Sequence, residues 1–189
     1  MLECEGHLVV AHDRADARRG TPLTLAQALE PIVAAGRPVL ADLKTPRAAD
    51  LLAAALALCD WGPRTVVSGS LPALERCACG CGAARAWTLP AGDDASARAG
   101  PFGLATAAAR ARVSAAATRA LGEGRCEAVS VDRHFLTPEL VAAVHAAGAR
   151  VYAWTVDSDA ELRRAIALDV DGLITSRSPR ARELLGAPV

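Results

Sequence analysis

Short β-type runs alternate with longer helical segments along this sequence, and this alternation constrains the fold more than any other feature. The runs are rich in β-branched or apolar residues and lie at 7–11, 38–43, 65–68, 85–89, 128–131, 150–156 and 172–175. Strands that alternate with helices in this way are typical of a parallel sheet with helices packed outside it. The fold class is therefore predicted to be α/β.

Helix boundaries are marked by capping residues. Thr24 with Gln27, and Ser158 with Glu161, have the spacing of a capping box. A Ser or Thr followed by Pro is a second start signal, and glycine is a common stop signal. These signals, with the helix propensity of an Ala/Arg-rich stretch, predict helices over 24–36, 47–60, 70–76, 104–121, 137–148 and 178–186, and one that begins at Ser158. Segments 80–82 and 91–103 are predicted to be surface loops.

Length and charge limit the classes of protein that remain. The chain has 189 residues, which at about 150 residues per domain favours a single domain over 1–189. Its 21 basic and 21 acidic residues give a formal net charge of zero, whereas a nucleic-acid binder needs a basic surface. The longest apolar run, 51–59, is too short to span a bilayer. No secretory signal begins the chain as given, so we expect a cytoplasmic protein with no integral membrane segment and no nucleic-acid partner.

The polar residues at the ends of the predicted strands are candidates for a site, because ligands of parallel sheets collect at the carboxyl ends of strands. His12 follows the first run, Asp42 and Lys44 end the second, and Trp154 ends the sixth. Lys44 is the sole lysine of the sequence. Because side chains alternate along a strand, Asp42 and Lys44 share one face. This set suits an anionic substrate held by a hard cation.

Each of these residues also has a simpler interpretation. His12 is either a buried histidine of a hairpin or a group in a catalytic position. Asp42 and Lys44 form either an ion pair at a strand end or part of a site. Trp154 belongs either to the core or to a pocket wall.

Other residues have chemistry that the sequence does not tie to a site. The six cysteines are expected to be thiols. Cys77, Cys79 and Cys81 resemble a metal cluster but lack the usual zinc-site spacing, so a solvent-side turn of small residues is favoured. His134 and His145 are interpreted as surface histidines.

Four short motifs occur in a fixed order on this pattern. They are G-x-L-V-V-x-H-D over 6–13, D-L-K over 42–44, W-T-V-D over 154–157 and V-D-G-L-I-T over 170–175. In this order, from about residue 2 to 179, the chain resembles the glycerophosphodiester phosphodiesterase family. The resemblance implies a (β/α)8 TIM-barrel type of fold and hydrolysis of glycerophosphodiesters to glycerol 3-phosphate and an alcohol.

The resemblance also implies roles for particular residues. His12 matches one of two histidines that act as acid and base. Asp42 takes the place of a metal-binding carboxylate for a divalent cation, Mg²⁺ or Ca²⁺, where the family usually has Glu. Lys44 matches a lysine that faces the phosphate or the metal, and Trp154 matches a tryptophan that lines the glycerol end of the pocket.

Two parts of the family pattern have no counterpart in the sequence. The H-R-G motif is absent, and the E-x-D motif would fall just upstream of Met1. Glu3 and Glu5 have the spacing of E-x-D, but we interpret them as part of a turn before a hairpin and not as metal ligands. A complete barrel typically has about 250 residues. We therefore expect a barrel that lacks its first two strands, because Met1 is not the true start or because the gene is truncated. Its open sheet edges would permit self-association.

Three functions follow from this comparison. The first is glycerophosphodiester hydrolysis, with weak or absent activity in the chain as given. The second is a non-catalytic barrel remnant that binds phosphate-bearing ligands. The third is hydrolysis of lysophospholipids or of phosphodiesters with another headgroup.

Overall fold

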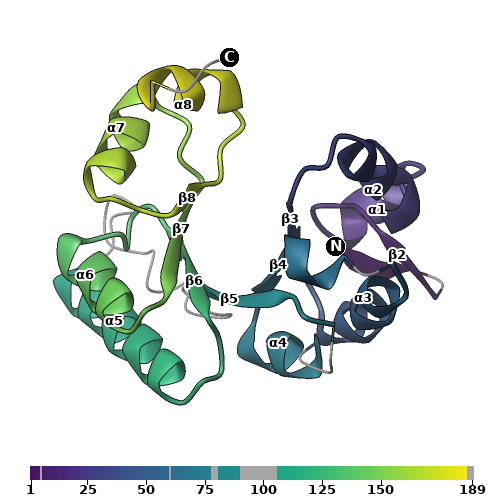
Figure 1. Ribbon diagram of the computed structural model, residues 1–189, viewed down its shortest axis with the longest axis horizontal. Coiled ribbons are helices and arrows are strands. Elements are labelled where there is room, and N and C mark those ends of the chain that lie inside the picture. The colour runs from purple at the N-terminus through teal and green to yellow at the C-terminus, as the bar shows by residue number, and fades with distance from the viewer. Residues whose placement is uncertain (5, 60, 78–80, 90–105, 187–189) are drawn as a thin grey trace. The chain divides into compact units, whose positions relative to one another are not determined.

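The computed structural model describes residues 1–4, 6–59, 61–77, 81–89 and 106–186. The chain divides into two compact units, an N-terminal unit, Met1–Trp87, and a C-terminal unit, Thr88–Val189. The strands are β1 (Leu2–Cys4), β2 (His7–Val9), β3 (Val39–Asp42), β4 (Thr65–Gly69), β5 (Ala84–Leu89), β6 (Ala128–Asp132), β7 (Arg150–Trp154) and β8 (Gly172–Leu173) (Figure 1). The helices are α1 (Arg14–Arg19), α2 (Leu25–Ala34), α3 (Pro46–Cys59), the 3₁₀ helix η1 (Gly62–Arg64), α4 (Leu71–Cys77), α5 (Ala107–Gly122), α6 (Pro138–Ala146), α7 (Asp159–Ala167) and α8 (Ser178–Leu184).

Strands β1 and β2 form an antiparallel hairpin in a sheet of their own. Gly6, with φ +81°, lies in the turn between the strands, where a left-handed backbone favours glycine. The hairpin brings Leu2 opposite Val9, and both pack with Ala17 of α1 in a small core. The prediction that 7–11 is a strand of the parallel sheet is therefore wrong, and Glu3 lies in a strand rather than a turn.

The parallel sheet of the N-terminal unit has the order β3-β4-β5. Its register places Asp42 opposite Ser68, and Gly69 opposite Trp87. Helices α3 and α4 pack against each other, and α4 packs on β4. Leu52, Leu74 and Val67 are almost fully buried in this core, and burial of each such side chain contributes about 1.5–3 kcal/mol. The predicted parallel α/β arrangement is confirmed here.

Met1 lies alongside the carboxyl end of β3. Its amino group donates to the carbonyl oxygen of Asp42, and its own carbonyl oxygen accepts from the Lys44 N–H at 3.0 Å. These two bonds on either side of Leu43 are those of a parallel strand pair. The backbone at Met1 therefore runs parallel to β3.

A close backbone contact joins η1 to the segment that follows α4. A Cβ on Gly62 would lie 1.3 Å from the carbonyl oxygen of Cys81, so only glycine fits there. Cys77 and Cys81 are both buried, and the Cys81 thiol donates to the Cys77 carbonyl oxygen at 3.4 Å. The predicted solvent-side turn is therefore wrong for these two residues, because their sulfurs fill the interior beside α4. Cys79 lies outside the described residues.

The C-terminal unit repeats the parallel arrangement with the order β6-β7-β8. Helices α5, α6 and α7 lie on one face of these strands (Figure 1). Val129, Val131, Val151 and Ala153 alternate along β6 and β7 and are fully buried. The intervening residues form the other face of the sheet, where register places Ser130 opposite Tyr152 and Asp132 opposite Trp154.

Most of the predicted helix starts are confirmed. Thr24 and Ser158 each form a complete capping box with Gln27 and Glu161, and Thr137 caps α6 with Pro138 in its first turn. Helix α8 differs, because its N-cap is Arg177 rather than Ser178 and no side chain bonds there. Helix α1, capped by Asp13, was not predicted.

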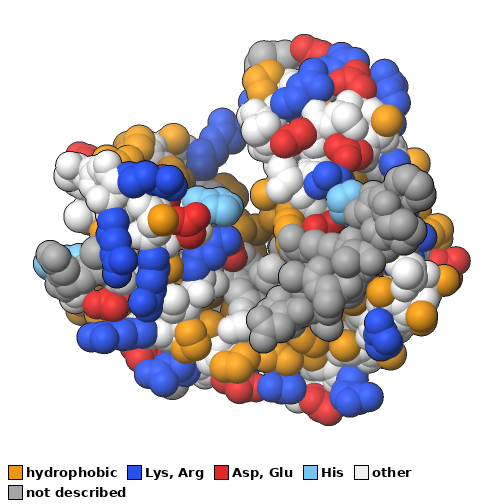
Figure 2. Space-filling view, turned by 180° about the vertical axis from the view of Figure 1, so that it is seen from behind, with side chains coloured by type: hydrophobic (Ala, Val, Ile, Leu, Met, Phe, Trp, Pro, Cys, Tyr) orange, Lys and Arg blue, Asp and Glu red, His pale blue; other side chains and the backbone are white. Residues whose placement is uncertain are grey.

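The surface charge and the length of the helices bear on the partners of the protein. On the face seen in Figure 2, basic side chains are spread over both units and acidic side chains lie among them. In the part of the chain that the structure describes, no helix combines the length and apolarity needed to cross a bilayer.

Candidate functional site

The carboxyl end of β3 holds an ion pair between two predicted site residues. Lys44 Nζ lies 2.5 Å from Asp42 Oδ2, and Ser68 Oγ donates to Asp42 Oδ1 at 3.2 Å. Lys44 and Asp42 are each more than one-third exposed. The predicted shared face of Asp42 and Lys44 is confirmed. Ser68 was not predicted as a site residue, since its contact depends on the register between β3 and β4.

His12 lies outside this group. Its side chain is 86% exposed and its Nδ1 lies 3.5 Å from Asp13 Oδ2, so the interpretation as a buried histidine is wrong. The hydrogen bond from the Asp16 N–H, with help from His12, lowers the pKa of Asp13. Among the described residues, no hydrogen bond or ion pair joins His12 to Asp42 or Lys44.

Trp154 ends β7 and is half-buried. Cross-strand partners point to the same face of a sheet, so Trp154 and Asp132 lie side by side at the carboxyl ends of β7 and β6. Asp132 is only 5% exposed. A buried carboxylate therefore lies next to the predicted pocket tryptophan.

The turn after β7 is organised by Asp157. Its Oδ1 accepts from the Ser176 N–H at 2.8 Å, from Ser176 Oγ at 3.0 Å and from Thr175 Oγ1 at 3.0 Å. The Ser176 N–H is the main cause of the lowered pKa of Asp157. Asp157 thus connects the segment after β8 to the turn after β7. Its carboxylate accepts all three of these hydrogen bonds through Oδ1.

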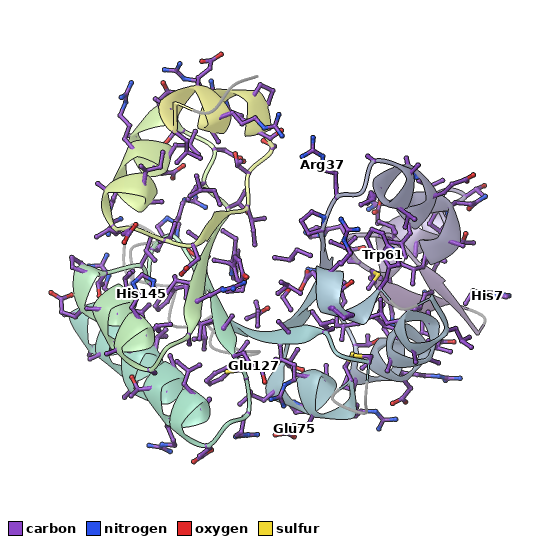
Figure 3. All side chains as sticks on the ribbon, viewed as in Figure 1. His7, Arg37, Trp61, Glu75, Glu127 and His145 are labelled. Atoms are coloured by element: carbon purple, nitrogen blue, oxygen red, sulfur yellow. The ribbon has the colours of Figure 1, made fainter. Side chains whose placement is uncertain are left out.

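Both histidines of the C-terminal unit are paired with aspartates. His134 Nδ1 lies 2.8 Å from Asp132 Oδ1, and His145 Nε2 lies 3.0 Å from Asp171 Oδ2; the His145 side chain extends from α6 (Figure 3). Each ring is about one-third exposed. Both histidines reach the surface, as predicted, and each also contacts an aspartate that the sequence did not reveal.

The described residues do not form a metal centre by themselves. Among them, no group of three or more His, Cys, Asp or Glu side chains could hold a metal ion. Asp42 is a single carboxylate, and its two oxygens already contact Lys44 and Ser68. A divalent cation typically takes several oxygen ligands, so this donor set does not fit one.

The structure therefore gathers the predicted residues only in part. Asp42 and Lys44 lie together, whereas His12 is exposed beside Asp13. Trp154 lies in the C-terminal unit beside Asp132. Parallel strands with helices outside and polar side chains at the carboxyl ends define the class of α/β proteins to which (β/α)8 barrels belong.

Comparison with known proteins finds a similarity to one family within this class. Residues 88–179 match the model of the Glycerophosphoryl diester phosphodiesterase family, so this segment of the chain is similar to that family. The Mycobacterium tuberculosis (strain ATCC 25618 / H37Rv) protein named "Probable glycerophosphodiester phosphodiesterase 2" is 44% identical over 50 residues, which are 26% of this chain and 19% of that protein.

Solved structures show the same fold. A glycerophosphodiester phosphodiesterase from Parabacteroides distasonis superposes with a TM-score of 0.72 at 16% identity, over 98% of this chain and 81% of that one. An Oleispira antarctica phosphodiesterase, solved with the product sn-glycerol-3-phosphate, gives 0.63 at 18% identity, over 88% and 62%. The chain thus has the TIM-barrel type of fold and spans less than two thirds of the Oleispira chain.

Proposed function

We propose that the protein hydrolyses glycerophosphodiesters to glycerol 3-phosphate and an alcohol. The observation that carries this proposal is the family match over 88–179, which includes Trp154 and Asp157 at the carboxyl end of β7. The product complex of the Oleispira relative supports the same class of substrate. Cleavage of such a diester adds water across one P–O bond and releases an alcohol.

The proposed residue roles follow their chemistry. Lys44, with its exposed ammonium, would hold a phosphate oxygen through a charge-assisted hydrogen bond. Asp42 would orient Lys44, and the exposed His12 would exchange protons with a reacting oxygen or with water. Trp154 would contact the glycerol part of the substrate.

The divalent cation implied by the resemblance, Mg²⁺ or Ca²⁺, has only Asp42 as a candidate ligand among the described residues. The proposal therefore routes no step through a metal. A direct check is whether hydrolysis changes when either cation is added after treatment with a chelator.

Release of glycerol 3-phosphate from glycerophosphocholine tests the proposal. Lys44→Met should weaken binding of glycerol 3-phosphate about tenfold or more, because a hydrogen bond to a charged group contributes about 1.5–3 kcal/mol. Arg112→Met, on the exposed side of α5, is the matched control and should change neither binding nor rate. Binding that is equal in both variants would exclude Lys44 from the phosphate site.

A second candidate function is binding of phosphate-bearing ligands without catalysis. The lack of a three-ligand metal group in the described residues favours it, while Lys44 still offers a cation. In this case calorimetry would show glycerol 3-phosphate binding that depends on Lys44, while no diester would be hydrolysed with or without divalent cations.

We also propose self-association through β3. On the side away from β4, only Met1 pairs with β3 among the described residues, and the exposed Leu40 lies on this edge. An open edge strand pairs readily with another chain. Leu40→Lys should therefore weaken concentration-dependent association in sedimentation velocity, whereas Leu185→Lys, at an exposed apolar residue outside the sheet, should not.

A further inference from the structure

The pair formed by Asp132 and His134 is the most specific polar arrangement that the proposed roles leave unused. Asp132 Oδ1 accepts from the His134 backbone N–H at 2.9 Å and lies 2.8 Å from the same residue's Nδ1. One carboxylate oxygen therefore fixes both the backbone and the ring of His134. The ring nitrogen Nε2 is left to point away from the carboxylate.

The surroundings hold this arrangement in place. Arg110 of α5 donates from Nε to the His134 carbonyl oxygen at 2.9 Å. The Arg133 N–H donates to the Trp154 carbonyl oxygen at 2.7 Å, which ties the end of β6 to the end of β7. A fixed backbone and a fixed ring reduce the cost of holding an imidazole in a reacting geometry.

The location of the pair matches that of a site. Asp132 is the cross-strand neighbour of Trp154 on the same face of the sheet, at the carboxyl edge where ligands of parallel sheets bind. A nearly buried carboxylate orients a partly exposed histidine, an arrangement typical of a general acid or base and the residue that positions it.

The second His–Asp pair of the unit provides a contrast. His145 and Asp171 have similar exposure and a similar contact distance, 3.0 Å. However, Asp171 precedes β8 and accepts from the N–H of Val151 near the start of β7, at the amino edge of the strands. Residues at that edge of parallel α/β folds serve stability rather than chemistry.

We propose that His134 is the acid that protonates the departing alcohol oxygen, with Asp132 as its positioning residue. This inference rests on the proposed hydrolysis. As the oxygen of water bonds to phosphorus, the bond from phosphorus to the alcohol oxygen breaks, and that oxygen takes the proton from His134 Nε2. The proton lost by the attacking water enters the solvent, and the solvent returns one to Nε2, so charge and atoms balance.

A small recess gives this proton a route to the solvent. His134 lines it together with Val156, Glu161 and Arg164, and its volume is about 60 Å³. A cavity of this size has room for at least one water molecule, and its mostly apolar lining includes the polar side chains of Glu161 and Arg164. A water there can carry a proton to the imidazole between turnovers.

The test compares His134→Gln with the matched control His145→Gln. With glycerophosphocholine, whose alcohol needs a proton to leave, His134→Gln should lower kcat about 100-fold or more, the usual contribution of a general acid. His145→Gln should keep kcat within about twofold. With the p-nitrophenyl ester of glycerol 3-phosphate, whose leaving group needs no proton, His134→Gln should lose less than about tenfold.

Asp132→Asn tests the positioning role. The ring then loses the carboxylate that fixes it, so kcat with glycerophosphocholine should fall about tenfold or more, while kcat with the p-nitrophenyl ester should fall much less. KM should change little. A purely structural role for Asp132 would lower kcat on both esters to the same extent.

Several outcomes would overturn the inference. Equal losses of His134→Gln on both substrates, or no loss on glycerophosphocholine, would exclude His134 as the acid. If the parent protein hydrolyses no diester, the proposed function fails separately, and ring nitrogen NMR with glycerol 3-phosphate decides what remains. A response at His134 and not at His145 would leave a ligand contact without proton transfer, and no response would exclude His134 from the site.

Discussion

At the scale of single residues, carboxylates near strand ends hold the backbone together in this chain. Asp171 Oδ2 accepts from the Val151 N–H at 2.8 Å and lies 3.0 Å from His145 Nε2. Burial raises the pKa of Asp171, but the hydrogen bonds from Val151 and His145 outweigh it, so the pKa lies below its ordinary value. The ionised form is therefore favoured by folding.

Asp171→Asn should lower the unfolding temperature at pH 7 by about 2–4 °C, as expected for the loss of about 1 kcal/mol in a chain of this length. A carboxylate with a lowered pKa stabilises the fold above its ordinary pKa, and the effect disappears as pH falls through the folded-state pKa. The difference between variant and parent should therefore shrink towards pH 3. A difference that grows on acidification would contradict this assignment.

The alternation of side chains along a strand allowed the shared face of Asp42 and Lys44 to be predicted from the sequence. Ser68 could not be found in the same way, because its contact with Asp42 depends on the register of two strands. The pair of Asp132 and His134 was missed for a related reason. Asp132 and His134 are only two residues apart in the sequence, but their side chains come into contact only when the turn after β6 is folded.

At the scale of elements, capping side chains define where helices begin. Ser158 Oγ accepts from the Glu161 N–H at 3.2 Å, and Glu161 Oε2 accepts from the N–H groups of Ser158 and Asp157. These bonds satisfy N–H groups that have no partner inside α7. The same carboxylate also contacts Arg133 with Oε1 at 2.6 Å, so this cap connects α7 to the end of β6.

Ser158→Ala should lower the free energy of unfolding by about 1 kcal/mol, the usual loss for a capping serine. Ser178→Ala is the matched control at α8, where no side-chain capping bond is present, and should stay within about 0.5 kcal/mol. Urea unfolding of both variants measures the difference. Equal losses would show that the Ser158 cap contributes nothing specific.

The helices that were predicted correctly have start signals made of residues that are close together in the sequence. Thr24 and Ser158 specify their helices through residues three positions away. The hairpin of β1 and β2 was mistaken for part of the parallel sheet, because strand direction depends on the partner and not on the run itself. Helix α1 has only six residues, although Asp13 accepting from Asp16 is a capping signal that the sequence contains.

At the scale of the whole molecule, the chain comprises two compact units that each contain parallel strands and covering helices. The length of the chain predicts a single domain, which would unfold as one cooperative unit. Whether the two units unfold together or separately stays a prediction. Units with separate cores can open with different free energies. A substitution confined to one core distinguishes the two cases.

Gly62→Ala provides this substitution, because its Cβ would lie 1.3 Å from the Cys81 carbonyl oxygen inside the N-terminal unit. The backbone must shift there, so amide hydrogens of β3 and β4 should exchange faster, by about tenfold or more for each 1.4 kcal/mol lost. Exchange in β6 and β7 should change much less if the two cores open separately. Mass spectrometry of peptides from each unit after hydrogen exchange measures both.

The control for this experiment is Gly122→Ala at the end of α5, where an added Cβ meets no atom within 4 Å. Alanine favours helix over glycine, so exchange should stay unchanged or slow slightly in the C-terminal unit. Equal acceleration of β3 and β6 by Gly62→Ala would mean that the strain spreads through one cooperative structure. In that case the chain behaves as the single domain expected from its length, because the two structural units unfold together.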